Sequence, residues 1–146
     1  MQKAVAIYLR GEKQDHQLEL CQEYVRLYCN EAVENCLIFQ DEGSLSDELP
    51  GLQSLMAAVN RRVLHTVVCA EIGVICKNTA ELAEMARRMD SNGVALILVK
   101  NAIDFSSALG RSFLLACDTL LELERTSVAS NIRDNMRMLA RSGRWL

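Results

Sequence analysis

Arginines at helical spacing are the first residues whose arrangement suggests a chemistry. Arg133, Arg137 and Arg141 recur at every fourth position near the C-terminus, and Arg144 follows them. On a helix such residues form one stripe, and a stripe of guanidinium groups can contact the phosphates of a nucleic acid. Cations near the end of a helix also offset its macrodipole. Both interpretations stay open, and the four arginines are candidate DNA contacts.

Six cysteines offer metal ligands or nucleophiles, but their spacing supports neither role. No two of them form a CxxC pair, and His16 and His65 are the only histidines, so we expect no zinc or other metal site. Most of the cysteines lie in apolar runs, where a reduced thiol packs as a small hydrophobe. Cys69 and Cys76 are the alternatives for a reactive thiol, with Lys77 as the single nearby cation that such a thiol needs.

Acidic and glycine-containing segments are possible sites for metals and phosphates. The pairs Asp41-Glu42 and Asp47-Glu48 enclose Ser44-Leu45-Ser46, which does not provide the alternating oxygen ligands of a calcium loop. A solvated loop is therefore expected there. Neither GxxxxGK nor GxGxxG occurs, so the sequence predicts no nucleotide-phosphate loop and no cofactor.

The composition predicts a globular domain with its own core. The chain has 146 residues, of which 50% are hydrophobic and 24% charged, enough apolar residues to exclude a disordered or low-complexity protein. With 16 Lys and Arg against 19 Asp and Glu, the net charge is −3, which does not favour a stand-alone polyanion binder. No apolar run approaches the roughly 20 residues of a membrane span, and no signal peptide is apparent. We expect no membrane association and a cytoplasmic location.

Short apolar runs alternate with segments of helical periodicity, which is typical of a mostly parallel sheet with helices on its faces. Pro50 favours a helix start, and Asn92-Gly93 suits a left-handed helix end. The expected class is α/β, with four strands and a short fifth near Ala102–Phe105. The other expected strands are Lys3–Leu9, Val33–Gln40, Val63–Cys69 and Val94–Val99, and the expected helices are Asp15–Cys29, Pro50–Arg62 and Thr79 to about Asn92.

The last third of the chain is expected to form one long helix. From Ala108 or Leu109 to about Arg141 there is no proline, and apolar residues recur at helical spacing. Such a helix would be about 50 Å long, more than the domain's own core can cover. We therefore divide the domain into an α/β core, residues 1–108, and a dimerisation helix, residues 109–146. Phe113–Leu121 should pack on the chain's own sheet, and the stripe expected to face a partner is Val128, Ile132, Met136 and Leu139.

Six short motifs stand at the joints of these elements. In chain order they are Ile7–Arg10, Asp41–Ser44, Pro50–Gln53, Ile103–Arg111, Leu121–Arg125 and Ser142–Leu146. Together they resemble the N-terminal catalytic domain of serine recombinases, the family of resolvases, invertases and large serine integrases. The resemblance covers nearly the whole chain and implies a resolvase-like α/β fold followed by a long helix.

The resemblance also implies a chemistry, for which most of the residues are absent. In the family a serine hydroxyl attacks a DNA phosphate, and arginines stabilise the charge on the phosphoryl oxygens. Arg10 matches one catalytic arginine, but Glu12 occupies the nucleophile position, and Ser44 is the first serine of the chain. The family's other catalytic positions, an aspartate and four arginines, are occupied by Ile72, Gly73, Cys76, Leu49 and Asn131.

Three functions follow as hypotheses. The first is a recombinase-like domain with a degenerate active site, which acts by self-association as a homodimer or as a heteromer with an active recombinase. The second is an active site-specific DNA recombinase that uses displaced residues. The third is a phosphate-binding or small-molecule-binding domain that uses the crevice around Arg10, Cys69 and Lys100. DNA binding by this chain alone is expected to be weak because its net charge is negative.

Overall fold

The apolar runs of the chain form a single five-stranded sheet in a computed structural model that describes residues 3–117 and 119. The strand order is β2-β1-β3-β4-β5, with every neighbouring pair parallel except the antiparallel pair β4–β5. This confirms the mostly parallel α/β class. The strands are β1 Ala4–Arg10, β2 Leu37–Asp41, β3 Leu64–Cys69, β4 Ala95–Leu98 and β5 Ile103–Asp104.

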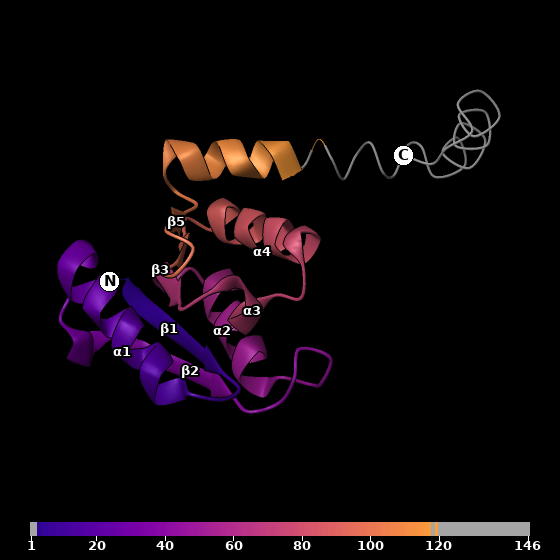
Figure 1. The fold of residues 1–146 in the computed structure, drawn as a ribbon. Coiled ribbons are helices and arrows are strands. Elements are labelled where there is room, and N and C mark those ends of the chain that lie inside the picture. The colour runs from indigo at the N-terminus through magenta and orange to yellow at the C-terminus, as the bar shows by residue number, and fades with distance from the viewer. Residues whose placement is uncertain (1–2, 118, 120–146) are drawn as a thin grey trace, which may run out of the picture.

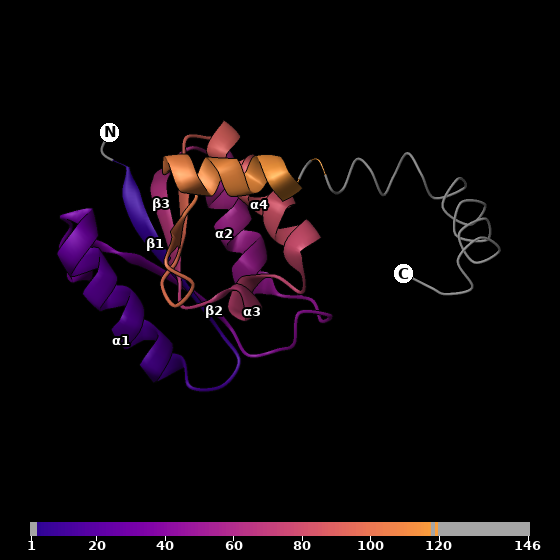
Figure 2. The ribbon, with the colours of Figure 1, turned by 45° about the horizontal axis from the view of Figure 1, so that its top comes forward.

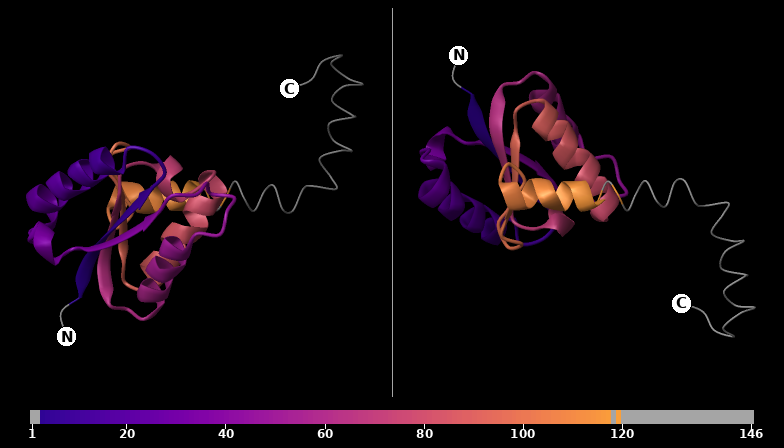
Figure 3. Two further views of the ribbon diagram at one scale, coloured as in Figure 1. Left: turned by 90° about the horizontal axis from the view of Figure 1, so that it is seen from below. Right: turned by 90° about the horizontal axis from the view of Figure 1, so that it is seen from above.

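Helices cover both faces of the sheet (Figures 1 and 3). Helix α1, Gln14–Tyr24, lies on one face, and α2, Pro50–Asn60, and α4, Thr79–Ser91, lie on the other. Pro50 opens α2 as the sequence predicts, because the first turn of a helix does not use the missing amide hydrogen. Asn78 caps α4, since its side chain accepts a hydrogen bond of 2.9 Å from the Glu81 amide.

The core lies around the two central strands, β1 and β3. Val5–Leu9 and Val67–Cys69 are buried almost completely, as expected for parallel strands that are covered on both faces. Leu55 and Val59 of α2 pack against one face together with Leu82 and Met89 of α4. Cys21 of α1 and the following Val25 are buried against the other face.

The chain between α1 and β2 differs from the sequence prediction. Helix α1 begins at Gln14, after a left-handed Lys13 and one residue before the predicted start at Asp15. The helix continues as a π-helical turn, η1, over Val25–Cys29. The predicted strand Val33–Gln40 was wrong in its first half, where Val33–Asn35 forms a 3-10 turn, η2. A short apolar run does not by itself distinguish a strand from a turn that packs against the core.

The final described helix extends over residues 108–117 and residue 119, and runs beside α4 (Figure 2). The Ser107 hydroxyl caps this helix by accepting a hydrogen bond of 3.1 Å from the Gly110 amide. A Cβ atom at Gly110 would collide with the Asp104 carbonyl oxygen. Leu114 and Cys117 are buried on the core, whereas Phe113 is 37% exposed. Even so, the Phe113 ring packs against that of the buried Phe105, with a centroid separation of 5.9 Å.

Candidate functional site

A crevice of about 460 Å³ lies where β1, β2 and β3 end. Because these strands are parallel and adjacent, the three segments that follow them meet at one edge of the sheet, the usual place for ligand sites in such folds. A short helix, α3, Ile72–Ile75, forms part of the third segment. The residues that line the crevice are Arg10, Gly11, Glu12, Gln17, Glu42, Gly43, Ser44, Glu71, Gly73 and Val74.

Arg10, the residue matched to a catalytic arginine, is engaged with backbone carbonyl groups on two loops. Its Nε donates a hydrogen bond of 2.8 Å to the Val74 carbonyl, and Nη2 donates one of 2.6 Å to Gly73. Nη1 donates a third, of 2.9 Å, to the Gly43 carbonyl. All three guanidinium nitrogens are used in this way, so Arg10 ties the segment after β2 to the segment after β3.

Gln17 of α1 holds the segment that contains Arg10 and Glu12. Its Nε2 donates hydrogen bonds of 2.9 Å to the carbonyls of both residues, and its Oε1 accepts one of 3.2 Å from the Arg10 amide. Gln17 is only 9% exposed, and a buried amide of this kind requires such partners. Sequence analysis missed this residue, although a glutamine one turn before Cys21, on the buried face of α1, was a signal for it.

The carboxylate of Asp41 is a structural acceptor at the end of β2. Its Oδ2 accepts hydrogen bonds of 2.6 Å from the Tyr8 hydroxyl and 2.8 Å from the Leu52 amide, and Oδ1 accepts one of 2.7 Å from the Gly51 amide. Two free amides at the N-terminus of α2 are satisfied in this way. Burial and the hydrogen bond to Asp41 raise the pKa of Tyr8. The N-terminus of α2 lies close against the end of β2, because a Cβ at Gly51 would collide with the Gln40 carbonyl.

Most of the charged residues that line the crevice are acidic. Glu12, Glu42 and Glu71 belong to its wall, and Arg10 is the single Lys or Arg among the lining residues. Lys100 is beside it, at 3.5 Å from the Glu71 carboxylate. Three carboxylates around one engaged guanidinium give a negative local field, which repels a phosphate. The third hypothesis, phosphate binding in this crevice, therefore finds no support in the lining residues.

Ser44 is the candidate for a displaced nucleophile in this crevice. It lines the crevice, and its hydroxyl is 2.8 Å from that of Ser46. Its backbone amide donates a hydrogen bond of 2.8 Å to the Asp47 carboxylate. Within the described part of the chain the Ser44 hydroxyl has no hydrogen bond to a histidine, lysine or carboxylate that would activate it.

The cysteines are free thiols, as predicted. Cys21, Cys69, Cys76 and Cys117 are buried, and Cys29 and Cys36 are half-buried. Burial, with a smaller contribution from Glu81, raises the pKa of Cys76 to about 12. Burial and the neighbouring Cys21 and Cys76 also raise the pKa of Cys69. A raised pKa opposes the thiolate form, which argues against the reactive-thiol alternative.

Several predicted site residues lie outside the described part of the chain. They are the candidate DNA contacts Arg133, Arg137, Arg141 and Arg144 and the predicted interface residues Val128, Ile132, Met136 and Leu139. Across residues 3–117 and 119, no group of three or more His, Cys, Asp or Glu side chains is arranged to hold a metal ion. No helix in that same part of the chain is long and apolar enough to cross a membrane.

Comparison with known proteins connects this geometry to a family. Residues 5–145 match the family model "Resolvase, N terminal domain". The N-terminal catalytic domain of TP901-1 integrase is similar at 22% identity and a TM-score of 0.69, with 85% of this chain and 98% of that one covered. A resolvase family site-specific recombinase from Streptococcus pneumoniae is similar at 18% identity and a TM-score of 0.60, with 97% and 100% covered.

The first open reading frame of transposon ISC1904 from Sulfolobus solfataricus P2 is similar at 18% identity and a TM-score of 0.54, with 88% of each chain covered. A search of curated protein sequences gave no match. The family model spans nearly the whole chain. Two of the motifs that carry the resemblance lie at the end of β1, at Arg10, and across β5 and the start of the final helix. The chain belongs to the resolvase N-terminal domain family of serine recombinases.

Proposed function

We propose that this domain does not cleave DNA and acts by association, either with a second copy of itself or with an active recombinase. The observation that carries the proposal is the composition of the crevice. Glu12 occupies the position that the resemblance assigns to the nucleophilic serine, and Glu42 and Glu71 line the same crevice. Arg10 is the one residue here that matches a catalytic arginine of the family, and its guanidinium donates hydrogen bonds to backbone carbonyls.

Loss of the nucleophile and of four arginines should remove most of the stabilisation of the phosphoryl-transfer transition state. Phosphoryl transfer through a covalent intermediate requires a nucleophile, and a carboxylate at that position repels the phosphate. Each missing electrostatic donor typically costs about 2.7–4 kcal/mol of transition-state stabilisation. With four of the family's arginine positions occupied by other residues, the remaining crevice cannot stabilise the charge on the phosphoryl oxygens.

Association is supported by apolar side chains at the start of the final helix. Leu109 is 79% exposed and Leu115 is 67% exposed, although large apolar side chains usually lie inside a domain. Leu109 and Phe113 are four residues apart and therefore share one face of the helix. The sequence analysis predicts a further apolar stripe beyond this helix start, formed by Val128, Ile132, Met136 and Leu139. A symmetric dimer would cover such surfaces on both copies.

The second candidate, an active recombinase with a displaced nucleophile, depends on Ser44. This serine does line the crevice, and Arg10 donates a hydrogen bond to the neighbouring Gly43 carbonyl. Among the described residues, the Ser44 hydroxyl forms no hydrogen bond to a general base. We therefore rank this candidate below the non-catalytic function.

A strand-cleavage assay distinguishes the two. The full chain is incubated with supercoiled plasmid, with an active serine recombinase as the positive control, and covalent protein–DNA adducts are measured on denaturing gels. We expect neither adduct nor nicking from the wild type. We expect the same from Glu12→Ser, because the hydroxyl alone does not replace the arginines. An adduct formed by the wild type and lost in Ser44→Ala would overturn the proposal.

A further inference from the structure

A groove lies between α2 and α4, on the face of the sheet that these two helices cover. Its volume is about 240 Å³, and it shares no lining residue with the crevice described above. Four segments of the chain contribute to it. The lining residues are Leu45 after β2, Leu52 and Met56 of α2, Ile75 of α3, and Glu81, Glu84, Met85 and Arg88 of α4. The groove is therefore a second concave surface, separate from the crevice.

Most of the lining residues of this groove are apolar. Ile75 is buried, and the other four apolar residues, Leu45, Leu52, Met56 and Met85, are half-buried. Methionine side chains are flexible and polarisable, so they adapt to apolar ligands of different shapes. Pockets for small molecules commonly combine such a lining with a few polar groups that orient the ligand. The groove therefore favours a ligand with a compact hydrophobic part.

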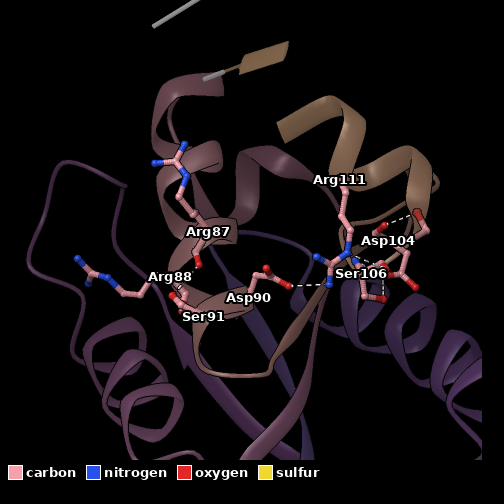
Figure 4. A network of polar contacts seen from close by, with 8 residues as sticks. Arg87, Arg88, Asp90, Ser91, Asp104, Ser106 and Arg111 are labelled. Atoms are coloured by element: carbon pink, nitrogen blue, oxygen red, sulfur yellow. Dashed lines mark hydrogen bonds and ion pairs between the residues drawn. The ribbon is translucent and has the colours of Figure 1, made fainter. Parts of the chain in front are cut away.

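Charged groups of both signs lie along the α4 side of the groove. Glu81, Glu84 and Arg88 are three and four residues apart, so they share one face of the helix. Glu84 and Arg88 have a spacing that permits an ion pair, yet none of these three side chains takes part in an ion pair among the described residues. Figure 4 shows the Arg88 side chain pointing away from the Asp90–Arg111 ion pair. Two carboxylates and one guanidinium are thus available to a ligand.

The volume of the groove limits the size of that ligand. An apolar cavity of about 150 Å³ holds benzene, and pockets for drug-sized molecules measure roughly 300–1,000 Å³. The groove, at about 240 Å³, fits a molecule somewhat larger than benzene, such as a single amino acid with a branched or aromatic side chain. A free amino acid also carries one ammonium and one carboxylate group. These charges complement the two glutamates and the arginine on α4.

We propose that this groove binds a free α-amino acid with an apolar side chain. The ammonium group of the ligand is held by Glu81 and Glu84, and its carboxylate by Arg88. Its side chain contacts Met56 and Met85. Hydrogen bonds between charged groups are stronger than those between neutral groups, and arginine often binds a carboxylate in a bidentate manner. The site requires neither the crevice nor self-association, so it goes beyond the function proposed above.

The test follows the methionine methyl resonances of the isotope-labelled full chain by NMR while L-phenylalanine is added. Met56 and Met85 report on the groove, and Met89, which is fully buried in the core, is the internal control. Two analogues of the ligand lack one charge each. Phenethylamine has no carboxylate, and hydrocinnamate has no ammonium group.

Two variants of the protein remove one charge each from the groove, Arg88→Gln and Glu84→Gln. Their matched controls are Arg61→Gln and Glu23→Gln, which remove the same charges from exposed positions that do not line the groove. Circular dichroism establishes that each variant is folded.

We expect saturable shifts of the Met56 and Met85 resonances with L-phenylalanine, and little change at Met89. Each analogue, and each of the two groove variants, should bind at least about tenfold more weakly, the factor that corresponds to one lost hydrogen bond between charged groups. The matched controls should bind like the wild type.

Three results would overturn the proposal. The first is the absence of a saturable shift at Met56 and Met85. The second is equal binding by the wild type and the two groove variants. The third is binding of phenethylamine or hydrocinnamate as tight as that of L-phenylalanine, which would show that the groove does not recognise both charges of an amino acid.

Discussion

The Tyr8 hydroxyl donates a buried hydrogen bond of 2.6 Å to the Asp41 carboxylate, joining β1 to the end of β2. The same carboxylate accepts the first free amides of α2, at Gly51 and Leu52. Two strands and a helix are thus joined by one side chain, and these hydrogen bonds hold the end of β2, where the loop from Glu42 begins, in place. The acidic wall of the crevice is therefore positioned by a bond inside the core.

Asp41→Ala should destabilise the fold more than Tyr8→Phe. Tyr8→Phe removes one hydrogen bond to a charged acceptor, which costs about 1.5–3 kcal/mol. Asp41→Ala removes the same bond and leaves the buried Tyr8 hydroxyl without a partner. It also leaves the Gly51 and Leu52 amides of α2 without their acceptor, and the loss of this cap costs about 1 kcal/mol more. Urea unfolding followed by circular dichroism measures both. Equal stabilities for the two variants would contradict this account of Asp41.

Arg10→Lys should lower the stability of the domain by about 1–3 kcal/mol, since a lysine ammonium cannot reach the Gly43, Gly73 and Val74 carbonyls together. Hydrogen exchange should become faster in residues 42–44 and 72–75. Arg26→Lys, at an exposed position, is the control and should leave both measurements unchanged. If Arg10→Lys behaves like this control, Arg10 is not a structural tie between the loops.

Gly110→Ala should destabilise the junction between β5 and the final helix. The added Cβ would collide with the Asp104 carbonyl, and relieving such a contact costs typically about 1–3 kcal/mol. Gly73→Ala is the matched control, because a Cβ there meets nothing within 4 Å and its φ is not positive. Thermal unfolding of the two variants should differ by several degrees. A Gly110→Ala protein as stable as Gly73→Ala would show that this junction packs less tightly.

Stability should fall at alkaline pH through the buried thiols. Burial raises the pKa of Cys21 and of Cys76 from 9.0 to about 12. Above about pH 9 the unfolded chain releases these protons and the folded chain keeps them, so stability is fully present below pH 9 and is lost as the pH rises towards 12. Urea midpoints under reducing conditions should decrease in that range. In Cys76→Ala the urea midpoint should decrease less steeply with pH. If it decreases as steeply as in the wild type, Cys76 does not contribute to the pH dependence.

Ile132→Asp should weaken association while leaving the fold intact. Ile132 belongs to the apolar stripe predicted from the sequence, and a charge placed there would be buried only in an assembly. Sedimentation velocity at tens of micromolar protein measures the effect. Asn131→Asp adds the same charge one position off the stripe and should associate like the wild type. A wild-type chain that sediments as a monomer at these concentrations would remove the basis for self-association.

Local patterns in the sequence were sufficient to predict most of the elements. Apolar runs identified β1, β3 and β4, Pro50 marked the start of α2, and the helix predicted from Thr79 is α4. These signals work because apolar alternation, helical periodicity and the missing proline amide each depend on residues a few positions apart. The α/β class follows from the alternation of the elements.

The same patterns failed between α1 and β2 for a physical reason. Val33 is partly buried and packs against the core from a 3-10 turn, and its apolar character is the same in a turn as in a strand. The strand begins only at Leu37, where pairing with Ala6 of β1 starts. Pairing with a strand about 30 residues away decides this boundary, and no local signal encodes it.

The sequence alone determined which chemical groups are available, and the tertiary structure decided what they do. The presence of Glu12 and Arg10 two residues apart is a property of the sequence. The partners of the Arg10 guanidinium are 33, 63 and 64 residues away along the chain, and they meet it because parallel strands bring three loops to one edge of the sheet. Contacts over such separations are fixed by strand order and packing, which local periodicity does not contain.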